Sequence, residues 1–138
     1  HETMVRLRAA KVEAALADVP DAVVAGDPEG ELLIVGWGST AGAITAAVRA
    51  ARASGRRVGH VQLRHLNPLP ANLGAVLKRY RRVLVPELNM GQLVWLLRAR
   101  YLVDALGYAK VQGKPFRQAE LEAKIDEILD RQGTTWQR

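Results

Sequence analysis

The feature that most constrains the fold is a repeated alternation between short apolar runs and helical patterns. Residues 32–37, LLIVGW, form an apolar run with no polar interruption, which is typical of a strand covered on both faces. Residues 40–54 follow with apolar side chains at helical spacing, namely Ile44, Ala47, Val48 and Ala51. Because strands that alternate with helices form βαβ units, we expect an α/β fold in three layers, a mainly parallel sheet with flanking helices.

The same alternation continues along the chain. We expect a helix at residues 3–17, a loop at 18–31, strands at 32–37, 58–63, 82–87 and 108–112, helices at 40–54, 90–102 and 118–131, and a short helix that begins at Pro70 and buries Tyr80. The carboxyl ends of parallel strands meet at one edge of a sheet, where binding sites collect. Three loops should therefore lie together there, at residues 36–42, 64–70 and 87–92.

The organisation of the chain indicates a piece of a longer polypeptide. The sequence begins at His1 rather than Met, within a helical pattern, and residues 18–31 (DVPDAVVAGDPEGE) are rich in Pro, Gly and Asp. We therefore interpret residues 1–31 as a helix and loop that link the chain to a preceding domain. Residues 32–138 then form the α/β domain itself.

Composition indicates a compartment and excludes some chemistry. The 138 residues include no cysteine, which excludes thiolate catalysis, disulfides and an iron–sulfur cluster held by this chain. No run reaches the roughly 18 apolar residues that a membrane span needs. The first ten residues also lack the apolar stretch of a secretory signal. We expect a cytoplasmic protein with no membrane contact.

The net charge of +6 is unevenly distributed along the sequence. Residues 32–117 contain fourteen Lys and Arg against two Asp and Glu, whereas both flanking segments are acidic. A basic centre can meet nucleic acid, an acidic protein or a small anion, or it can pair internally with the acidic flanks. The few aromatic residues do not interleave with the basic runs, as stacking on nucleic acid would require, so we predict no nucleic-acid partner.

The turn after the first strand, GWGSTAG, has two interpretations. Its backbone N–H groups at a helix start could hold an anion, and Arg64 at the end of the second strand would suit a 2′-phosphate. The spacing matches neither the dinucleotide fingerprint nor the Walker loop. We favour the alternative, a tight corner in which a hydroxyl caps the helix and Trp37 is an apolar anchor that fills an interface. The candidate anion-binding or interface residues are Gly36, Gly38, Ser39, Thr40 and Gly42.

The other polar residues near this edge have structural as well as functional explanations. His65 is a candidate general base, but the sequence places neither a nucleophile nor an orienting carboxylate beside it, and His60 lies in mid-strand. Asn89 suffices as a helix cap, and Glu87 is expected to pair with a nearby arginine. Because paired carboxylates and metal-ligand spacing are also missing, we predict no catalytic residue and no metal ligand in this chain.

Several segments taken together resemble one family. LLIVGWGSTAGAI, HVQLRHLNPLPANLGAVLKRY, RVLVPELNMGQL, LLRARYLVDALGY and KVQGKPF are similar, in this order, to the C-terminal part of the α subunit of 2-oxoacid:ferredoxin oxidoreductases, in its 2-oxoglutarate branch. HETMVRLRAAKV resembles the stretch that leads into this part. Each motif is weak alone, but five in order are specific and cover nearly the whole chain. The family often has an aromatic residue at the position of Ala41.

The resemblance implies a transketolase C-terminal-like domain within a larger enzyme. In that family the complete assembly converts 2-oxoglutarate, CoA and oxidised ferredoxin to succinyl-CoA, CO2 and reduced ferredoxin. Thiamine diphosphate, Mg2+, a [4Fe-4S] cluster and CoA would be bound by other parts of the α subunit and by a β subunit, not by this chain. The chain would be a structural and assembly domain of a heterotetramer, inactive alone.

The resemblance also makes the edge loops candidate subunit contacts. The predicted interface residues are Trp37, Asn67, Glu87, Asn89 and Gln92. Two other functions stay open. One is an NADP- or nucleotide-binding Rossmann-like module that uses Arg64, and the other is a basic interaction module that binds an acidic protein or nucleic acid through residues 49–82.

Overall fold

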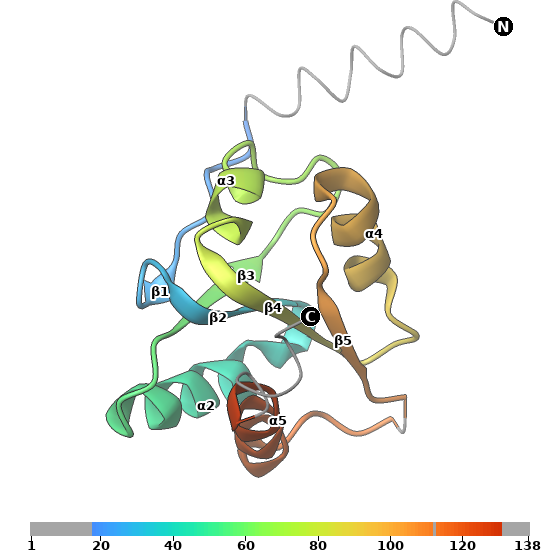
Figure 1. Cartoon of the computed structure of the whole chain (residues 1–138). Helices are drawn as coiled ribbons and strands as arrows, with labels where there is room; N and C mark the ends of the chain where they lie inside the picture. The colour runs from blue at the N-terminus through green and yellow to red at the C-terminus, as the bar shows by residue number, and fades with distance from the viewer. Residues whose placement is uncertain (1–17, 112, 131–138) are drawn as a thin grey trace, which may run out of the picture.

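A five-stranded sheet runs through the middle of the computed structural model, which describes residues 18–111 and 113–130 (Figure 1). The spatial order of the strands is β1-β3-β2-β4-β5. The last four of them in chain order are parallel, and β1 pairs antiparallel with β3, which confirms the mainly parallel sheet. The strands are β1 (Ala25–Gly26), β2 (Gly30–Trp37), β3 (Val58–Leu63), β4 (Tyr80–Glu87) and β5 (Leu106–Ala109).

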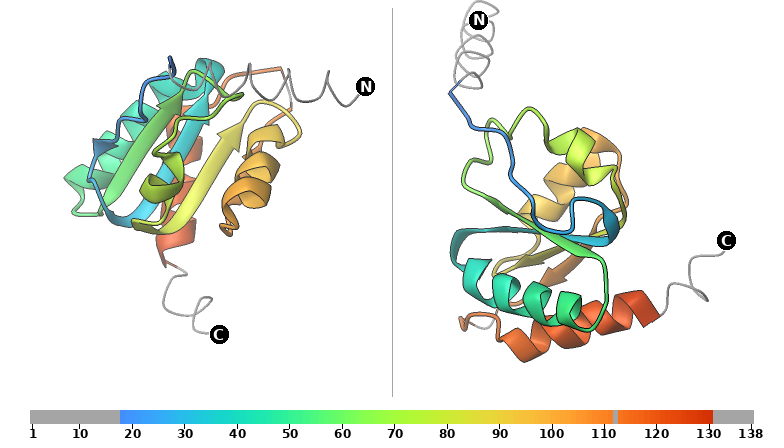
Figure 2. Two further views of the ribbon diagram at one scale, coloured as in Figure 1. Left: turned by 90° about the horizontal axis from the view of Figure 1, so that it is seen from above. Right: turned by 90° about the vertical axis from the view of Figure 1, so that its left-hand side faces the viewer.

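Helices cover both faces of the sheet, so the predicted three layers are present. On one face lie α2 (Ala41–Ala53), which follows the 3-10 turn η1 (Gly38–Thr40), and α5 (Gln118–Asp130). On the other face lie α3 (Leu73–Leu77) and α4 (Gln92–Tyr101), as both views of Figure 2 show. Among the described residues no helix is long and apolar enough to cross a membrane.

The apolar run of β2 is uninterrupted because both of its faces are buried. Leu33 and Val35 belong to the core on the α3–α4 face, whereas Leu32 and Ile34 belong to the core on the α2–α5 face. All four side chains are fully buried. A strand with one solvated face would need alternating polar residues, so this run is the local cause of the layered fold.

Residues 18–31, predicted as a loop, contain the short strand β1 and are fastened to the sheet. The Asp27 N–H donates to the Val58 carbonyl (3.1 Å), and the Asp27 carboxylate accepts from the Val58 N–H (3.1 Å) and from Arg52 Nε (3.1 Å). The Tyr80 hydroxyl donates to the Asp27 carbonyl. These bonds lie between residues distant in sequence, which is why the local Pro, Gly and Asp content did not reveal them.

Several element boundaries also differ from the prediction. Tyr80 begins β4 instead of ending a helix, and α3 begins at Leu73, three residues after Pro70. The strand β5 occupies residues 106–109 rather than 108–112, and α4 begins at Gln92 rather than at Met90. The helix predicted at residues 3–17 lies outside the described residues.

Candidate functional site

The first corner of the candidate site joins β2 to α2 through η1. Gly38 has a φ of +67°, in the left-handed region that glycine enters without strain. Packing excludes a larger residue at Gly36, because a Cβ there would lie 2.5 Å from both Gln62 Oε1 and Ile44 Cδ1. A Cβ at Gly42 would meet no atom within 4 Å. The corner geometry therefore requires two of the three glycines in the motif.

The hydroxyl groups of this corner do not cap the helix, so the predicted cap is wrong. Neither η1 nor α2 has a side-chain hydrogen bond at its N-cap. Thr40 already has helical backbone angles, whereas a capping residue is extended, and its hydroxyl donates back to the Trp37 carbonyl (3.0 Å). Gly38 and Ser39 are exposed. The outer surface of the corner is therefore accessible, and its role as an anion or interface loop stays a prediction.

The side chain of Gln62, on β3, links this corner to the sheet by a hydrogen bond. Its Nε2 donates to the Gly38 carbonyl (3.2 Å), and its Oε1 lies 2.9 Å from His60 Nε2. Burial lowers the pKa of His60 from its ordinary value of 6.5, while the hydrogen bond to Gln62 opposes this shift. His60 is thus a buried, neutral part of the structural network.

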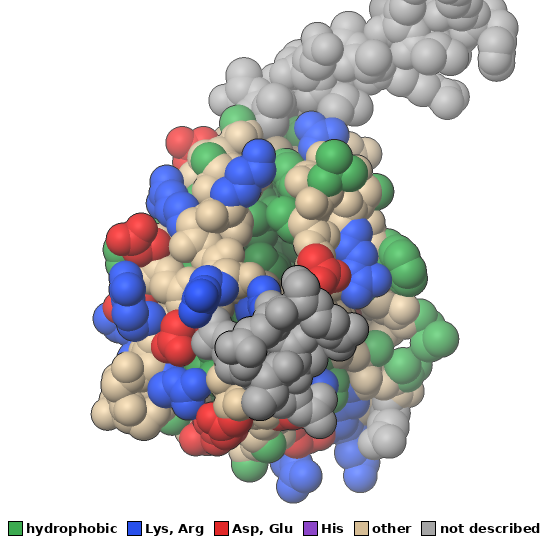
Figure 3. All heavy atoms as spheres, viewed as in Figure 1, with side chains coloured by type: hydrophobic (Ala, Val, Ile, Leu, Met, Phe, Trp, Pro, Cys, Tyr) green, Lys and Arg blue, Asp and Glu red, His purple; other side chains and the backbone are tan. Residues whose placement is uncertain are grey.

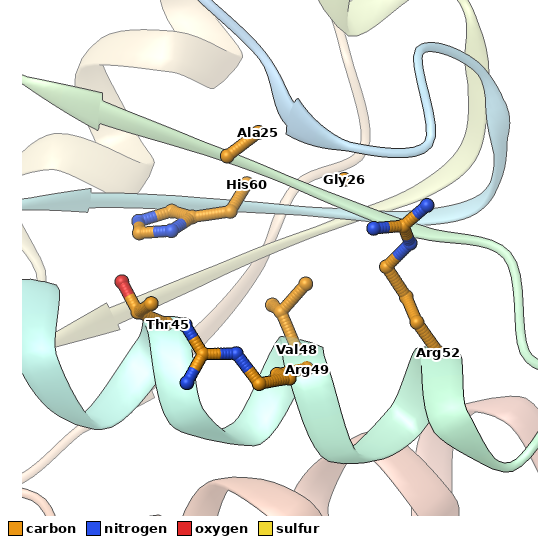
Figure 4. A pocket seen from close by; sticks show the side chains of 7 residues that line it. All are labelled: Ala25, Gly26, Thr45, Val48, Arg49, Arg52 and His60. Atoms are coloured by element: carbon orange, nitrogen blue, oxygen red, sulfur yellow. The ribbon is translucent and has the colours of Figure 1, made fainter.

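An open groove of about 560 Å³ lies beside this network, between the segment before β1, the start of α2 and the end of β3. It continues into a hollow of about 200 Å³. The His60 ring and Thr45 lie at one end of this hollow and Arg52 at the other (Figure 4). Arg52 is held by Asp27, whereas Arg49 is exposed on the wall. The groove thus combines cationic side chains with a neutral imidazole.

The loop after β3 forms the mouth of the same groove. Arg64 and His65 line it and are exposed. Asn67 lies further along this loop, also exposed, next to a cis peptide bond with Pro68. The structure therefore brings Arg64 to the groove, whereas Asn67, a predicted interface residue, is exposed on the same loop without lining the groove.

The second corner joins β4 to α4 and is built around Glu87. This side chain is only 1% exposed. Its Oε1 accepts from the Leu93 N–H (2.7 Å) and from Trp37 Nε1 (3.1 Å), and its Oε2 accepts from the Val94 N–H (3.1 Å). The expected arginine partner is replaced by three N–H donors. A carboxylate is stable there because it faces the positive end of the helix dipole.

Asn89 supports the same helix start, as the sequence suggested, but from outside the helix. Its Oδ1 accepts from the N–H groups of Gly91 (2.8 Å) and Gln92 (3.2 Å). Gly91 is the N-cap, with φ +91°, so the helix begins two residues later than predicted. This corner therefore contains four of the predicted interface residues, namely Trp37, Glu87, Asn89 and Gln92. Glu87 itself is buried, so it affects the surface only by positioning Trp37 and the first turn of α4.

Part of the positive charge of the basic centre is paired within the chain. Arg52 pairs with Asp27, Arg56 with Glu31 (3.9 Å) and with Asp130 (3.4 Å). Figure 3 shows Lys and Arg side chains interspersed with Asp and Glu on the face that it views. The internal pairing of basic centre and acidic flanks is therefore present. Within residues 18–111 and 113–130, no three His, Cys, Asp or Glu residues are grouped as a metal site requires.

Residues 30–105 match the model of the pyruvate:ferredoxin oxidoreductase core domain II. The chain belongs to this family. The matched region contains both corners and every strand from β2 to β4, so the family assignment rests on the sheet and the loops at its carboxyl edge.

Individual relatives agree with this assignment. The chain is 52% identical, over 88% of its length, to the 2-oxoglutarate oxidoreductase subunit KorA of Mycobacterium tuberculosis. It matches a 2-oxoglutarate:ferredoxin oxidoreductase from Magnetococcus marinus, solved with 2-oxoglutarate, coenzyme A and succinyl-CoA bound, over 94% of its length with a TM-score of 0.86 and 30% identity. A split-gene transketolase, 19% identical with a TM-score of 0.57 over 78% of the chain and 41% of its own, shows the same fold. These comparisons confirm the resemblance and the α/β fold stated from sequence.

The chain spans about a fifth of the length of two of these relatives. It covers 18% of the Mycobacterium subunit and 23% of the Magnetococcus chain. In these two relatives, the region that matches this chain is therefore one part of a much longer protein.

Proposed function

We propose that this chain is a non-catalytic structural and assembly domain of the α subunit of a thiamine diphosphate-dependent, cytoplasmic 2-oxoglutarate:ferredoxin oxidoreductase. The complete enzyme would convert 2-oxoglutarate, CoA and oxidised ferredoxin to succinyl-CoA, CO2 and reduced ferredoxin, with a β subunit and ferredoxin as partners. The observation that carries the proposal is 52% identity to a 2-oxoglutarate oxidoreductase subunit across 88% of the chain.

The geometry of the candidate site supports a structural role. Two polar side chains at the carboxyl edge of the sheet, Gln62 and Glu87, form hydrogen bonds that hold the backbone in place. Glu87 binds the first turn of α4, and Gln62 binds the carbonyl group of Gly38. A catalytic acid or base must reach a substrate proton, and the buried Glu87 cannot do so while it accepts three N–H groups.

The donor set of the chain does not fit the iron–sulfur group of such an enzyme. [4Fe-4S] clusters are held by Cys thiolates, and this chain contains no cysteine. The proposal therefore assigns the cluster, together with thiamine diphosphate, Mg2+ and CoA, to other parts of the α subunit and to the β subunit. This chain would supply a rigid surface on which those parts assemble.

The test uses the full-length α subunit that contains this chain, co-expressed with its β subunit. The purified assembly should reduce ferredoxin in a reaction that needs both 2-oxoglutarate and CoA, and the 138-residue chain alone should show no turnover. Decarboxylation of 2-oxoglutarate by the chain alone would overturn the non-catalytic role. A preference of the assembly for another 2-oxoacid would overturn the substrate, and a rise in melting temperature of the chain with NADP would favour the nucleotide-binding alternative.

A further inference from the structure

Large apolar side chains are exposed along the outer face of α4 and at its two ends. Met90 is 79% exposed, Trp95 64%, Leu96 37% and Leu102 89%. Ala99, one turn beyond Trp95, is exposed between them. We call these five residues the α4 patch. On the side where Figure 1 places α4, Figure 3 shows hydrophobic side chains at the surface. Among the described residues, none of the large exposed apolar side chains belongs to α2, α3 or α5.

The conformation of Leu102 indicates that the patch is more than chance exposure. Leu102 is the C-cap of α4 and has φ 54° and ψ 40°, the left-handed conformation that glycine or asparagine usually adopts at this place. A leucine there is strained, and its exposed side chain gains no packing in return within the described chain. A strained residue with no local compensation points to a contact made elsewhere.

The charged side chains of α4 itself are cationic. Residues 92–101 contain Arg98 and Arg100 but no Asp or Glu, and the exposed Asp104 lies two residues beyond Leu102. The Arg98 guanidinium lies 4.8 Å from the centre of the Trp95 ring, and its Nε donates to the Ala105 carbonyl (2.8 Å). Trp95 and Arg98 are thus ordered before any partner binds, which reduces the entropy lost on association. Trp, Met and Arg at a surface are typical of the central part of protein interfaces.

The route of the chain indicates from which side a partner comes. The Asn72 amide, just before α3, pairs with the backbone of Ala22 in both directions, with bonds of 2.7 and 2.9 Å. Ala22 and Val24 pack on the core of the α3–α4 face. The described chain therefore enters on the face that carries the α4 patch. A domain that precedes it, as expected for residues 1–31, would approach this face.

We propose that the α4 patch docks onto the rest of the α subunit, on a surface with an apolar centre and carboxylates around it. This inference rests on the proposed function, because it takes the chain to be one domain of that subunit. The chain covers 18% of the Mycobacterium relative, so most of such a subunit lies outside it and is tethered to it. Tethering makes a contact within the subunit the favoured occupant of an apolar face.

The test measures the accessibility of the patch, and the chain suits it because it has no cysteine of its own. Ala99→Cys places a thiol on α4, and Ala123→Cys places a matched thiol on the exposed face of α5. The rate of maleimide labelling at each position is followed by peptide mass spectrometry in three samples: the 138-residue chain, the full-length α subunit, and the α subunit with its β subunit.

The proposal expects Ala99→Cys to react at least about tenfold more slowly in the full-length α subunit than in the 138-residue chain, because interface cores exclude solvent. Ala123→Cys should keep its rate. Adding Trp95→Ser and Leu102→Ser to the Ala99→Cys subunit should restore fast labelling, and Arg100→Glu should accelerate it in part.

Three outcomes would overturn the proposal. Equal rates in all samples would show a free surface, and slowing only when the β subunit is added would assign the patch to that subunit. Slowing that depends on the concentration of the 138-residue chain would assign it to a second copy. Ferredoxin reduction by the same α–β assembly tests the proposed function separately, so an active enzyme with fast Ala99→Cys labelling would refute the docking alone.

Discussion

The two corners at the carboxyl edge of the sheet have the same topological role and different chemistry. At the β2–α2 corner, no side chain caps the helix, and the turn is formed by glycines packed against β3 and α2. At the β4–α4 corner, a buried carboxylate and an asparagine side chain supply acceptors to four N–H groups at the helix start. The first corner is shaped mainly by its glycines, and the second by the side chains of Glu87 and Asn89.

This difference indicates which corner has its helix start open to a ligand or a partner. The first N–H groups of α4 are occupied from inside the chain, so nothing external is needed there. The start of α2 receives no side-chain cap, and Gly38 and Ser39 are exposed beside it. An anion or a neighbouring subunit would therefore bind at the β2–α2 corner and not at the β4–α4 corner.

The largest effect is expected from Glu87→Gln at the capped corner. Glutamine retains one carbonyl acceptor and turns an NH2 group toward N–H donors, so about 3 kcal/mol of unfolding free energy should be lost. Urea unfolding followed by circular dichroism measures it. The matched Glu122→Gln, on α5, should stay within about 0.5 kcal/mol of the parent. Equal effects of the two substitutions would contradict the capping role of Glu87.

A smaller effect is expected from glycine substitution at the uncapped corner. Gly36→Ala forces a methyl group against Gln62 and Ile44, and should destabilise the fold by about 2 kcal/mol. Gly42→Ala meets open space inside a helix and should stabilise it by about 0.5–1 kcal/mol. Thermal unfolding of the two variants measures the difference. A Gly36→Ala variant as stable as the parent would show that Gly36 is not a packing requirement.

The smallest effect is expected from His60, next to the uncapped corner, as a pH dependence of the free energy of unfolding. Burial lowers the pKa of His60 below 6.5, so the unfolded chain binds more protons between that lowered value and pH 6.5. The contribution of His60 to stability is therefore complete above pH 6.5 and decreases as the pH falls through this window. Unfolding free energy measured from pH 7.5 to 5 should show a shallower slope for His60→Gln. The exposed His65→Gln should keep the parental slope, and the same slope in all three proteins would exclude His60 as its source.

The layered fold could be predicted because apolar periodicity reports burial directly. The run in β2 and the spacing in α2 led to the observed sheet and helix within a few residues. The face of α4 could not be predicted, because residues 93–97 (LVWLL) are all apolar and no spacing distinguishes inside from outside. The structure buries Leu93, Val94 and Leu97 and leaves Trp95 and Leu96 exposed.

The sequence predicted where the candidate site lies, but not which hydrogen bonds its side chains form. The three edge loops were predicted correctly. The partners of Glu87 could not be predicted, because they include backbone N–H groups, which every residue except proline carries. The groove was missed because one wall comes from residues 20–25, which were interpreted as a loop. The available signal for the Gln62 bridge was the pair of polar residues, His60 and Gln62, two positions apart in the strand.

The two outer strands of the sheet have a consequence for how this chain can meet others. β1 is two residues long and β5 is four. An extended peptide, or the edge of a second sheet, would find only a few unpaired backbone groups along either of these strands. Templated growth from strand to strand, the usual route to fibrils and runaway aggregation, is therefore poorly supported, and specific association depends on side-chain surfaces instead.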